Sequence, residues 1–214
     1  ALNSGTDALT IGLHLIGVKK NDEVITPPNS FIASTAAIVH LGAKPVFADV
    51  LIDQNIDPNE IEKKITSKTK AIMPVHLTGR VSKMDKIMKL ANKYKLTVIE
   101  DCAQSIGSKY LGQYSGSFGK IGCFSTHPLK NLNSFGDGGF ITTNNKTIYE
   151  MAKSLSNHGI YNRNIVKNFG YVSRMDNIQA GILNFKIGKL KEIIKKRRGH
   201  AKLYINGIKS KNII

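Results

Sequence analysis

The chain has 214 residues, of which 41% are hydrophobic, and a formal net charge of +16 at pH 7. This length suffices for one sizeable core. Because neither a secretory signal nor an apolar run of membrane-spanning length is present, we expect a cytoplasmic protein without a membrane partner.

Helix and strand patterns alternate along the first hundred residues. Helical patterns are predicted over residues 7–16, 31–41, 59–65 and 84–94, and strands over residues 23–26, 45–49, 70–76 and 96–101. Continuous apolar strands that alternate with helices are typical of a largely parallel sheet covered on both faces.

The pattern changes after residue 120. Strands predicted over residues 121–126 and 139–143 are close in sequence, which is consistent with antiparallel pairing, and helices follow over residues 147–156 and 176–198. The predicted fold class is therefore α/β, with a mostly parallel, mixed sheet sandwiched by helices.

The chain begins without an initiator Met and ends shortly after the long helical pattern. We therefore expect residues 1–214 to be one incomplete domain of a longer protein. In this interpretation the helix over residues 176–198 leads toward a further, smaller domain.

A phosphate-binding pattern precedes the first helix. Gly5, Thr6 and Asp7 follow Ser4 at the point where the helix begins. Free backbone N–H groups at the positive end of a helix, with a threonine hydroxyl beside them, suit a phosphate. The same residues often serve only as a helix cap.

Three further side chains lie where a parallel sheet binds ligands. Asp101 ends the strand over residues 96–101 and Gln104 follows it, and ligands of such sheets bind beyond the carboxyl ends of strands. An acid there suits a ribose hydroxyl, a metal or a protonated ring nitrogen, or it caps a helix. Phe31, at a strand-to-helix turn, suits stacking on a planar ring, with an ordinary core aromatic as the alternative.

Lys130 has the most informative surroundings. It follows a short strand, Ser125 and a proline-containing turn, and it precedes the glycine cluster 136–139. Such a setting can hold one amine still and partly dry, and an amine held in this way can form a Schiff base with a carbonyl cofactor.

Two other kinds of site are not indicated. The histidines have no metal-ligand spacing, so we expect no metal site. Cys102 and Cys123 lie in separate apolar stretches without a CxxC spacing, which favours buried free thiols over a disulfide framework.

These features match one ligand when they are taken in order. A phosphate cradle, a stacking aromatic, a strand-end acid with a nearby amide, and a serine with a lysine complement a phosphate arm, a pyridine nitrogen, a phenolic oxygen and an aldehyde. That ligand is pyridoxal 5′-phosphate (PLP).

The sequence resembles the sugar-nucleotide aminotransferases of the DegT/DnrJ/StrS group, which are PLP enzymes of the aspartate-aminotransferase fold, called fold type I. The resemblance runs nearly from end to end. Its motifs lie at residues 4–9, 22–27, 42–49, 69–76, 100–104, 124–139, 157–159 and 174–180.

The resemblance implies roles for the residues at matching positions. Lys130 would bind the cofactor covalently and move a proton, Asp101 would pair with the ring nitrogen, and Gln104 would bind near the ring oxygen. The remaining contacts would be made to the ring face by Phe31 and to the phosphate by Gly5, Thr6, the Asp7 amide and Ser125.

The resemblance also implies a reaction and partners. The enzyme would be a homodimer that moves an amino group from an amino donor, L-glutamate, to a nucleotide-linked keto-sugar. A related sugar 3-dehydratase has histidine where this chain has Lys130, so transamination is favoured over dehydration. Many family members that aminate C4 carry Glu before the glycine pair, whereas this chain has Gly136-Asp-Gly-Gly139. The resemblance therefore favours amination at C3 over C4.

One segment departs from the family pattern Gly-x-Asn-x-Arg, whose Asn reaches the phosphate in a neighbouring subunit. This chain has Val172 at that position, between Tyr171 and Ser173. Valine cannot donate that hydrogen bond, so the candidate substitute is Ser173 or a residue outside this chain. Arg174 matches the pattern and is a candidate for the substrate or subunit interface, with a surface ion pair as the alternative.

Two other functions remain as alternatives. One is a catalytically silent fold-mate used for regulation or binding, which Val172 favours and Lys130 opposes. The other is nucleic-acid binding by the basic stretch 186–198. No nucleic-acid motif accompanies that stretch, so we expect a solvated face and no nucleic-acid partner.

Overall fold

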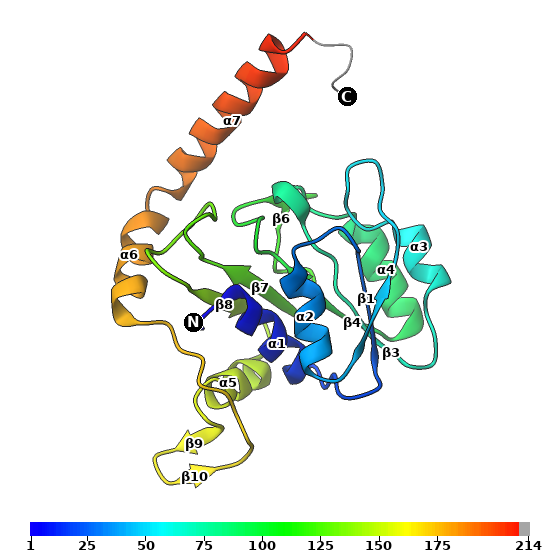
Figure 1. The fold of residues 1–214 in the computed structure, drawn as a ribbon, viewed down its shortest axis with the longest axis vertical. Coiled ribbons are helices and arrows are strands. Elements are labelled where there is room, and N and C mark those ends of the chain that lie inside the picture. Colours follow the sequence, from blue (N-terminus) through cyan, green and yellow to red (C-terminus); the bar gives the residue numbers. More distant parts are fainter. Residues whose placement is uncertain (210–214) are drawn as a thin grey trace.

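The computed structural model describes residues 1–209. A six-stranded sheet with the order β2-β1-β3-β4-β7-β8 forms its centre (Figure 1). The strands are β1 (Glu23–Thr26), β2 (Lys44–Phe47), β3 (Thr69–Ile72), β4 (Thr97–Asp101), β7 (Ile121–Ser125) and β8 (Gly139–Thr142).

The sheet is parallel except at one edge. All neighbours from β2 to β7 pair in parallel, whereas β8 pairs antiparallel with β7, with Ser125 opposite Gly139. The predicted mostly parallel, mixed sheet is therefore confirmed. Because β4 and β7 are parallel neighbours, Asp101 and Ser125 lie at the same edge of the sheet.

Helices cover both faces of the sheet. The helical elements are α1 (Gly5–Leu15), α2 (Ile32–His40), α3 (Pro58–Lys63), η1 (Leu77–Gly79), α4 (Met84–Tyr94), α5 (Lys146–Leu155), α6 (Asn177–Ile187) and α7 (Leu190–Gly207).

Two core clusters follow from strand alternation. Val24 and Ile99 pack in the cluster that includes α1 and α2, whereas their strand neighbours Ile25 and Val98 pack in the cluster that includes α3 and α4. Successive side chains of a strand point to opposite faces, so one short apolar strand supplies both cores.

The strand predicted over residues 70–76 is shorter than expected, since β3 ends at Ile72. Pro74 has no N–H to donate to a neighbouring strand. The Pro74 carbonyl still accepts a hydrogen bond from the Asp101 N–H (3.0 Å), and Val75 forms an isolated bridge to Asp101. The chain therefore stays beside the end of β4 without continuing the strand.

Two small hairpins were not predicted. They are β5 (Lys109–Tyr110) with β6 (Gln113–Tyr114), and β9 (Ile160–Asn162) with β10 (Ile165–Val166). The hairpin of β9 and β10 lies apart from the central sheet in Figure 1.

The prediction of one continuous helix over residues 176–198 is wrong. The structure has two helices there, α6 and α7, which are separated by Gly188 and Lys189. The Lys189 N–H bonds the Lys186 carbonyl, three residues back, instead of following the i−4 pattern. No residue of either helix is fully buried, so core packing does not enforce a straight helix across the glycine.

The helix α7 projects from the rest of the molecule (Figure 1). Its first turns pass close to the loop after β4, because a Cβ atom on Gly107 would lie 2.7 Å from the Ile194 side chain. Among residues 1–209, no helix is both long and apolar enough to cross a membrane.

Candidate cofactor-binding site

A cavity of about 440 Å³ lies at the carboxyl edge of the sheet. The first turns of α1 and α2 and the segments that follow β4 and β7 surround it. Most of the predicted cofactor residues line it, namely Gly5, Thr6, Phe31, Asp101, Gln104, Ser125 and Lys130. Asp7 is the predicted cofactor residue that is not among the lining residues.

The N-terminus of α1 opens toward this cavity. Within the described part of the chain, the backbone N–H groups of Gly5 and Thr6 have no hydrogen-bond partner. The Asp7 N–H is already bound, because it donates to the Ser4 Oγ (3.0 Å) that caps the helix. The two free N–H groups and the positive end of the helix dipole suit an anion.

Two glycines allow α1 to approach the sheet this closely. A Cβ atom on Gly5 would lie 2.5 Å from the Ser125 Cβ, and one on Gly139 would lie 2.3 Å from the Ser4 carbonyl oxygen. Any larger residue would therefore push α1 away from β7 and β8. The glycines thus bring the free N–H groups of α1 next to the Ser125 hydroxyl.

Asp101 is buried, with 4% of its surface exposed. Its Oδ2 accepts a hydrogen bond from Ser34 Oγ (2.7 Å) and its Oδ1 accepts one from the Ala103 N–H (3.1 Å). Burial raises the pKa of the Asp101 carboxyl above its usual value, and these hydrogen bonds, with His76 and Lys130 nearby, oppose that rise. A cation inside the cavity would favour the ionised carboxylate.

The amide of Gln104 has a defined orientation. Its Oε1 accepts a hydrogen bond from the Thr78 N–H (2.7 Å). Since only the oxygen of the amide can accept this bond, its NH₂ group remains a donor. A donor at this position suits an anionic oxygen of a ligand.

Phe31 lies at the rim of the cavity and not in the core. It is the N-cap residue of α2, its surface is 70% exposed, and it lines the cavity. An exposed aromatic beside a cavity is available for stacking on a planar ligand.

Lys130 is carried by a tightly bonded turn. Its N–H bonds the His127 carbonyl (2.8 Å), and Pro128 between them has the backbone angle that such a turn requires. The Leu129 N–H donates to His127 Nδ1, and Asn133 Nδ2 donates to the Pro128 carbonyl. These hydrogen bonds fix the backbone of the turn that carries Lys130. The lysine itself is half-buried.

The loop that contains Lys130 is closed at its base. The Thr126 N–H bonds the Gly138 carbonyl, and the Ser134 N–H bonds the Thr126 carbonyl, each at 2.8 Å. The buried Ser134 hydroxyl adds a second bond to Thr126. From outside, Gln179 of α6 accepts a hydrogen bond from the Phe135 N–H (2.9 Å).

A second buried cluster lies behind Asp101. His76, Glu100 and Cys102 bring potential metal ligands within 4.8 Å of one another. Both oxygens of Glu100 are already bound, one by His76 Nε2 (3.0 Å) and the Gly116 N–H, the other by the N–H groups of Phe118 and Gly119. This cluster therefore ties β4 to the turn before β7.

Burial, together with the neighbouring Glu100 and Asp101 carboxylates, raises the pKa of the Cys102 thiol well above its usual value. Because both oxygens of Glu100 are already bound by protein donors, the cluster offers no free carboxylate ligand. We therefore assign His76, Glu100 and Cys102 a structural role.

The segment that departs from the family pattern is bound to α1. Val172 is exposed, whereas Ser173 is fully buried. The Ser173 hydroxyl donates to Asp7 Oδ2 (2.6 Å) and accepts from the Asn3 N–H (3.2 Å), so it is not free to contact a second chain. Arg174 is exposed and donates to Asn157 Oδ1 (2.9 Å).

Sequence reasoning missed Ser34, although it lines the cavity and binds Asp101. One signal was available. Phe31 and Ser34 are three residues apart, so the start of a helix places them on one face. A serine on the same face as a predicted ring-binding aromatic was therefore a candidate.

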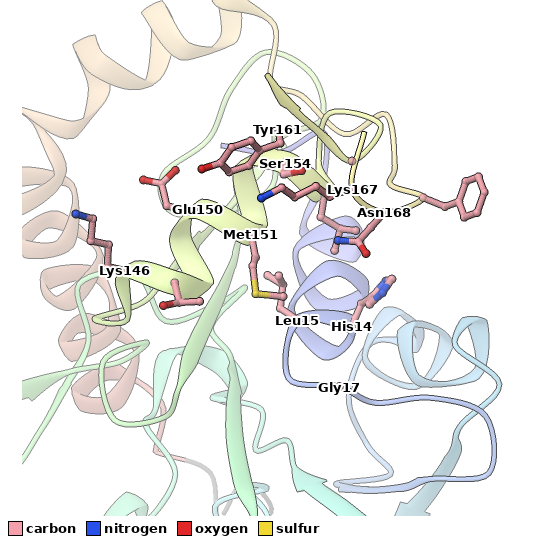
Figure 2. A pocket seen from close by; sticks show the side chains of 14 residues that line it. His14, Leu15, Gly17, Lys146, Glu150, Met151, Ser154, Tyr161, Lys167 and Asn168 are labelled. Atoms are coloured by element: carbon pink, nitrogen blue, oxygen red, sulfur yellow. The ribbon is translucent and has the colours of Figure 1, made fainter. Parts of the chain in front are cut away.

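A larger cavity, of about 930 Å³, contains none of the predicted site residues. It lies between the end of α1, α5 and the β9–β10 hairpin. Figure 2 shows Met151 reaching from α5 toward Leu15, with Lys167 and Asn168 on the side of the hairpin. Its lining includes Ser154 and His14, but within residues 1–209 no hydrogen bond joins the Ser154 hydroxyl to a base. The cavity around Lys130 therefore remains the candidate site.

Comparison with known proteins agrees with this geometry. Residues 1–214 match the DegT/DnrJ/EryC1/StrS aminotransferase family. A UDP-N-acetyl-3-dehydro-alpha-D-glucosamine 3-aminotransferase of Acidithiobacillus ferrooxidans is 47% identical over 84% of this chain and 49% of its own length. A pleiotropic regulatory protein of Geobacillus stearothermophilus is 43% identical over 94% of this chain and 54% of its own length.

Among solved structures, the crystal structure of S. venezuelae DesV in complex with a ketimine intermediate has a TM-score of 0.95. Its sequence is 36% identical, and the match covers 98% of this chain and 57% of that chain. The chain thus spans about half the length of the relatives that it matches.

Proposed function

Because this chain belongs to the DegT/DnrJ/EryC1/StrS aminotransferase family, we propose that the protein containing it is a PLP-dependent aminotransferase. It moves an amino group from L-glutamate to a nucleotide-linked keto-sugar. The observation that carries this proposal is the convergence of Lys130, Asp101 and the N-terminus of α1 on one cavity.

The groups around the cavity fit PLP. The free N–H groups of Gly5 and Thr6 and the Ser125 hydroxyl suit its phosphate. The buried Asp101 carboxylate suits a protonated ring nitrogen, and the Gln104 NH₂ suits the phenolic oxygen. Phe31 at the rim suits a ring face.

The chemistry divides between the cofactor and the chain. When bound, PLP supplies an electron sink for the transfer of an amino group. Lys130 Nζ would hold the cofactor through its carbonyl carbon and, once the amino donor has displaced it, would be the free amine placed to take the proton from the α-carbon of that donor. Asp101 would hold the positive charge on the ring nitrogen, and the N-terminus of α1 would hold the phosphate.

We also propose the position that receives the amine. Amination at C3 is supported by the Asp137-containing glycine cluster and by the 3-aminotransferase named among the relatives. Arg174, which is exposed on the segment after β10, is the candidate for the substrate or subunit contact.

Assembly and domain organisation belong to the same proposal. Residues 1–214 form the cofactor-binding domain of the longer protein, which acts as a homodimer. Support for a subunit contact comes from α6, where Ile178, Phe185 and Ile187 are each more than half exposed. Ile178 and Phe185 are seven residues apart and so lie on one face of α6, and exposed apolar side chains on one face favour a protein interface.

The test uses the full-length protein incubated with PLP. We expect a visible absorption band from lysine-bound PLP, and borohydride reduction followed by peptide mapping should place the pyridoxyl group on Lys130. The Lys130→Ala variant should lose the band, whereas Lys120→Ala, at an exposed lysine outside the cavity, should keep it.

Addition of L-glutamate separates an enzyme from a silent binding protein. In an aminotransferase, glutamate converts the bound cofactor to its pyridoxamine form and the band disappears. A band that persists with glutamate, or a pyridoxyl group on another lysine, would contradict the proposal.

A further inference from the structure

We propose that Ser34 is a positioning residue, whose hydroxyl holds the Asp101 carboxylate in the orientation that receives the ring N–H of the cofactor. This inference rests on the proposed function, because it assigns the ring nitrogen to Asp101. The proposed function does not require it, since another group could hold the carboxylate.

The geometry of the carboxylate supports this role. Ser34 Oγ donates to Asp101 Oδ2 and the Ala103 N–H donates to Oδ1, so each oxygen has one fixed donor on the protein side. A carboxylate offers about four lone-pair positions. The two donors therefore fix the plane of the group and leave acceptor positions for a cation in the cavity.

Ser34 couples the carboxylate to α2. It is 1% exposed and lies in the first turn of that helix, one turn after Phe31. Phe31, the N-cap residue, makes no side-chain capping bond. The bond from Ser34 to Asp101 thus links the start of α2 to the end of β4. One helical turn carries both the aromatic proposed for the ring face and the donor to the ring-nitrogen partner.

The surroundings of Asp101 make this one bond important. The titratable groups close to the Asp101 carboxylate are His76 after β3, Lys130 after β7, Cys123 on β7 and the chain neighbour Cys102. Asp101 itself is only 4% exposed, and a hydrogen bond to a buried charge is stronger than the same bond in water. Losing Ser34 Oγ would leave Oδ2 without its donor.

The test compares two ligands on the full-length protein. One is pyridoxamine 5′-phosphate, which cannot form a covalent bond to Lys130. The other is its 1-deaza analogue, in which a C–H replaces the ring nitrogen and Asp101 has nothing to bind. Dissociation constants are measured by titration calorimetry for the wild type and for Ser34→Ala, Ser34→Thr and Ser115→Ala.

Ser115 provides the matched control. It is also buried, and its hydroxyl donates a 2.7 Å bond to the Ser105 carbonyl, but it does not line the cavity. If Ser34→Ala does not fold, Ser34→Cys, which has a similar volume and a weaker donor, carries the same comparison.

We expect Ser34→Ala to raise the dissociation constant of pyridoxamine 5′-phosphate roughly tenfold to a hundredfold, which is the effect of losing one hydrogen bond to a charged group. Its affinity for the deaza analogue should stay at the wild-type value. Ser34→Thr should bind both ligands as the wild type does, and so should Ser115→Ala.

Two results would overturn the inference. One is an equal loss of affinity for both ligands in Ser34→Ala, which is expected of a serine that only supports the fold. The other is a Ser34→Ala protein that binds both ligands as the wild type does. A wild type that binds the two ligands equally well would count against Asp101 as the partner of the ring nitrogen, and so against the proposed function itself.

Discussion

The Ser173 hydroxyl donates a 2.6 Å hydrogen bond to the Asp7 carboxylate, between residues 166 positions apart in the chain. The same hydroxyl accepts a bond from the Asn3 N–H. Ser173 therefore holds the residues on both sides of the Ser4 cap. The segment after the β9–β10 hairpin is in this way tied to the helix end that we propose as the phosphate site.

The first prediction concerns the hydrogen bonds of the Ser173 hydroxyl to Asp7 and Asn3. Ser173→Ala leaves the Asp7 carboxylate and the Asn3 N–H without their partner, which should lower the free energy of unfolding by about 1–3 kcal/mol. It should also weaken the binding of pyridoxamine 5′-phosphate, because the end of α1 is less well held. Urea unfolding and calorimetry of the full-length protein measure the two effects.

The control for Ser173 is Ser117→Ala, because the half-buried Ser117 hydroxyl, within residues 1–209, bonds only the nearby Tyr114 carbonyl. It should change neither quantity measurably. If Ser173→Ala binds pyridoxamine 5′-phosphate as tightly as the wild type, the hydrogen bonds of Ser173 do not help to position the proposed phosphate site.

The second prediction concerns Gly5. An alanine there would place its Cβ 2.5 Å from that of Ser125, so α1 must shift away from β7. We expect Gly5→Ala to lower the free energy of unfolding by about 1–3 kcal/mol, as overpacking does. The free N–H groups would move with the helix, so affinity for the phosphate-bearing ligand should fall as well.

Gly199 is the matched position for this comparison. It lies exposed in α7, and a Cβ atom there would meet nothing within 4 Å. Gly199→Ala should therefore stabilise the protein by up to about 1 kcal/mol, since alanine is the better helix former. A gain in stability for both variants would contradict the close packing of Gly5 against Ser125.

The shared position of Asp101 and Lys130 beside one cavity could be predicted from the sequence, because it follows from chain order. Asp101 ends a buried parallel strand, and Lys130 lies in a loop that starts from the neighbouring strand β7. Ligands bind beyond the carboxyl ends of such strands. A rule about strand ends was thus enough to bring the two residues to the same cavity.

The residues that support the site could not be predicted in this way. The partner of Ser34 depends on how α2 packs over β4, and the partner of Ser173 lies at the other end of the chain. Periodicity also did not reveal the break between α6 and α7, because a single glycine at position 188 leaves the apolar pattern intact. The partners of Ser34 and Ser173 are fixed by tertiary contacts, whereas the helix break occurs where no core packing holds α6 and α7 in line.

The third prediction concerns the pH dependence of the cofactor-free protein. Burial raises the pKa of Asp101 above the ordinary value of 3.8, so the folded state binds its proton more tightly than the unfolded state does. The stability contributed by the protonated group is complete below pH 3.8 and is lost as the pH rises through the folded pKa. Asp101→Asn does not titrate and should lack this decrease.

Urea unfolding of both proteins at a series of pH values measures this effect as the difference between their free energies of unfolding. With bound pyridoxamine 5′-phosphate the decrease should be smaller, because a protonated ring nitrogen would favour the ionised carboxylate. Parallel pH profiles for the two cofactor-free proteins would contradict the prediction.

The fourth prediction concerns the two cysteines. Cys102 and Cys123 are each about 1% exposed, and burial raises the pKa of both thiols well above the usual value. Because the thiolate is the reactive form, neither should react with Ellman's reagent in the folded protein. In denaturant both of the cysteines in residues 1–214 should react quickly. Rapid labelling of either one in the folded protein would mean that β4 and β7 separate readily, and the support beneath Asp101 and Lys130 would then be less rigid than their hydrogen bonds indicate.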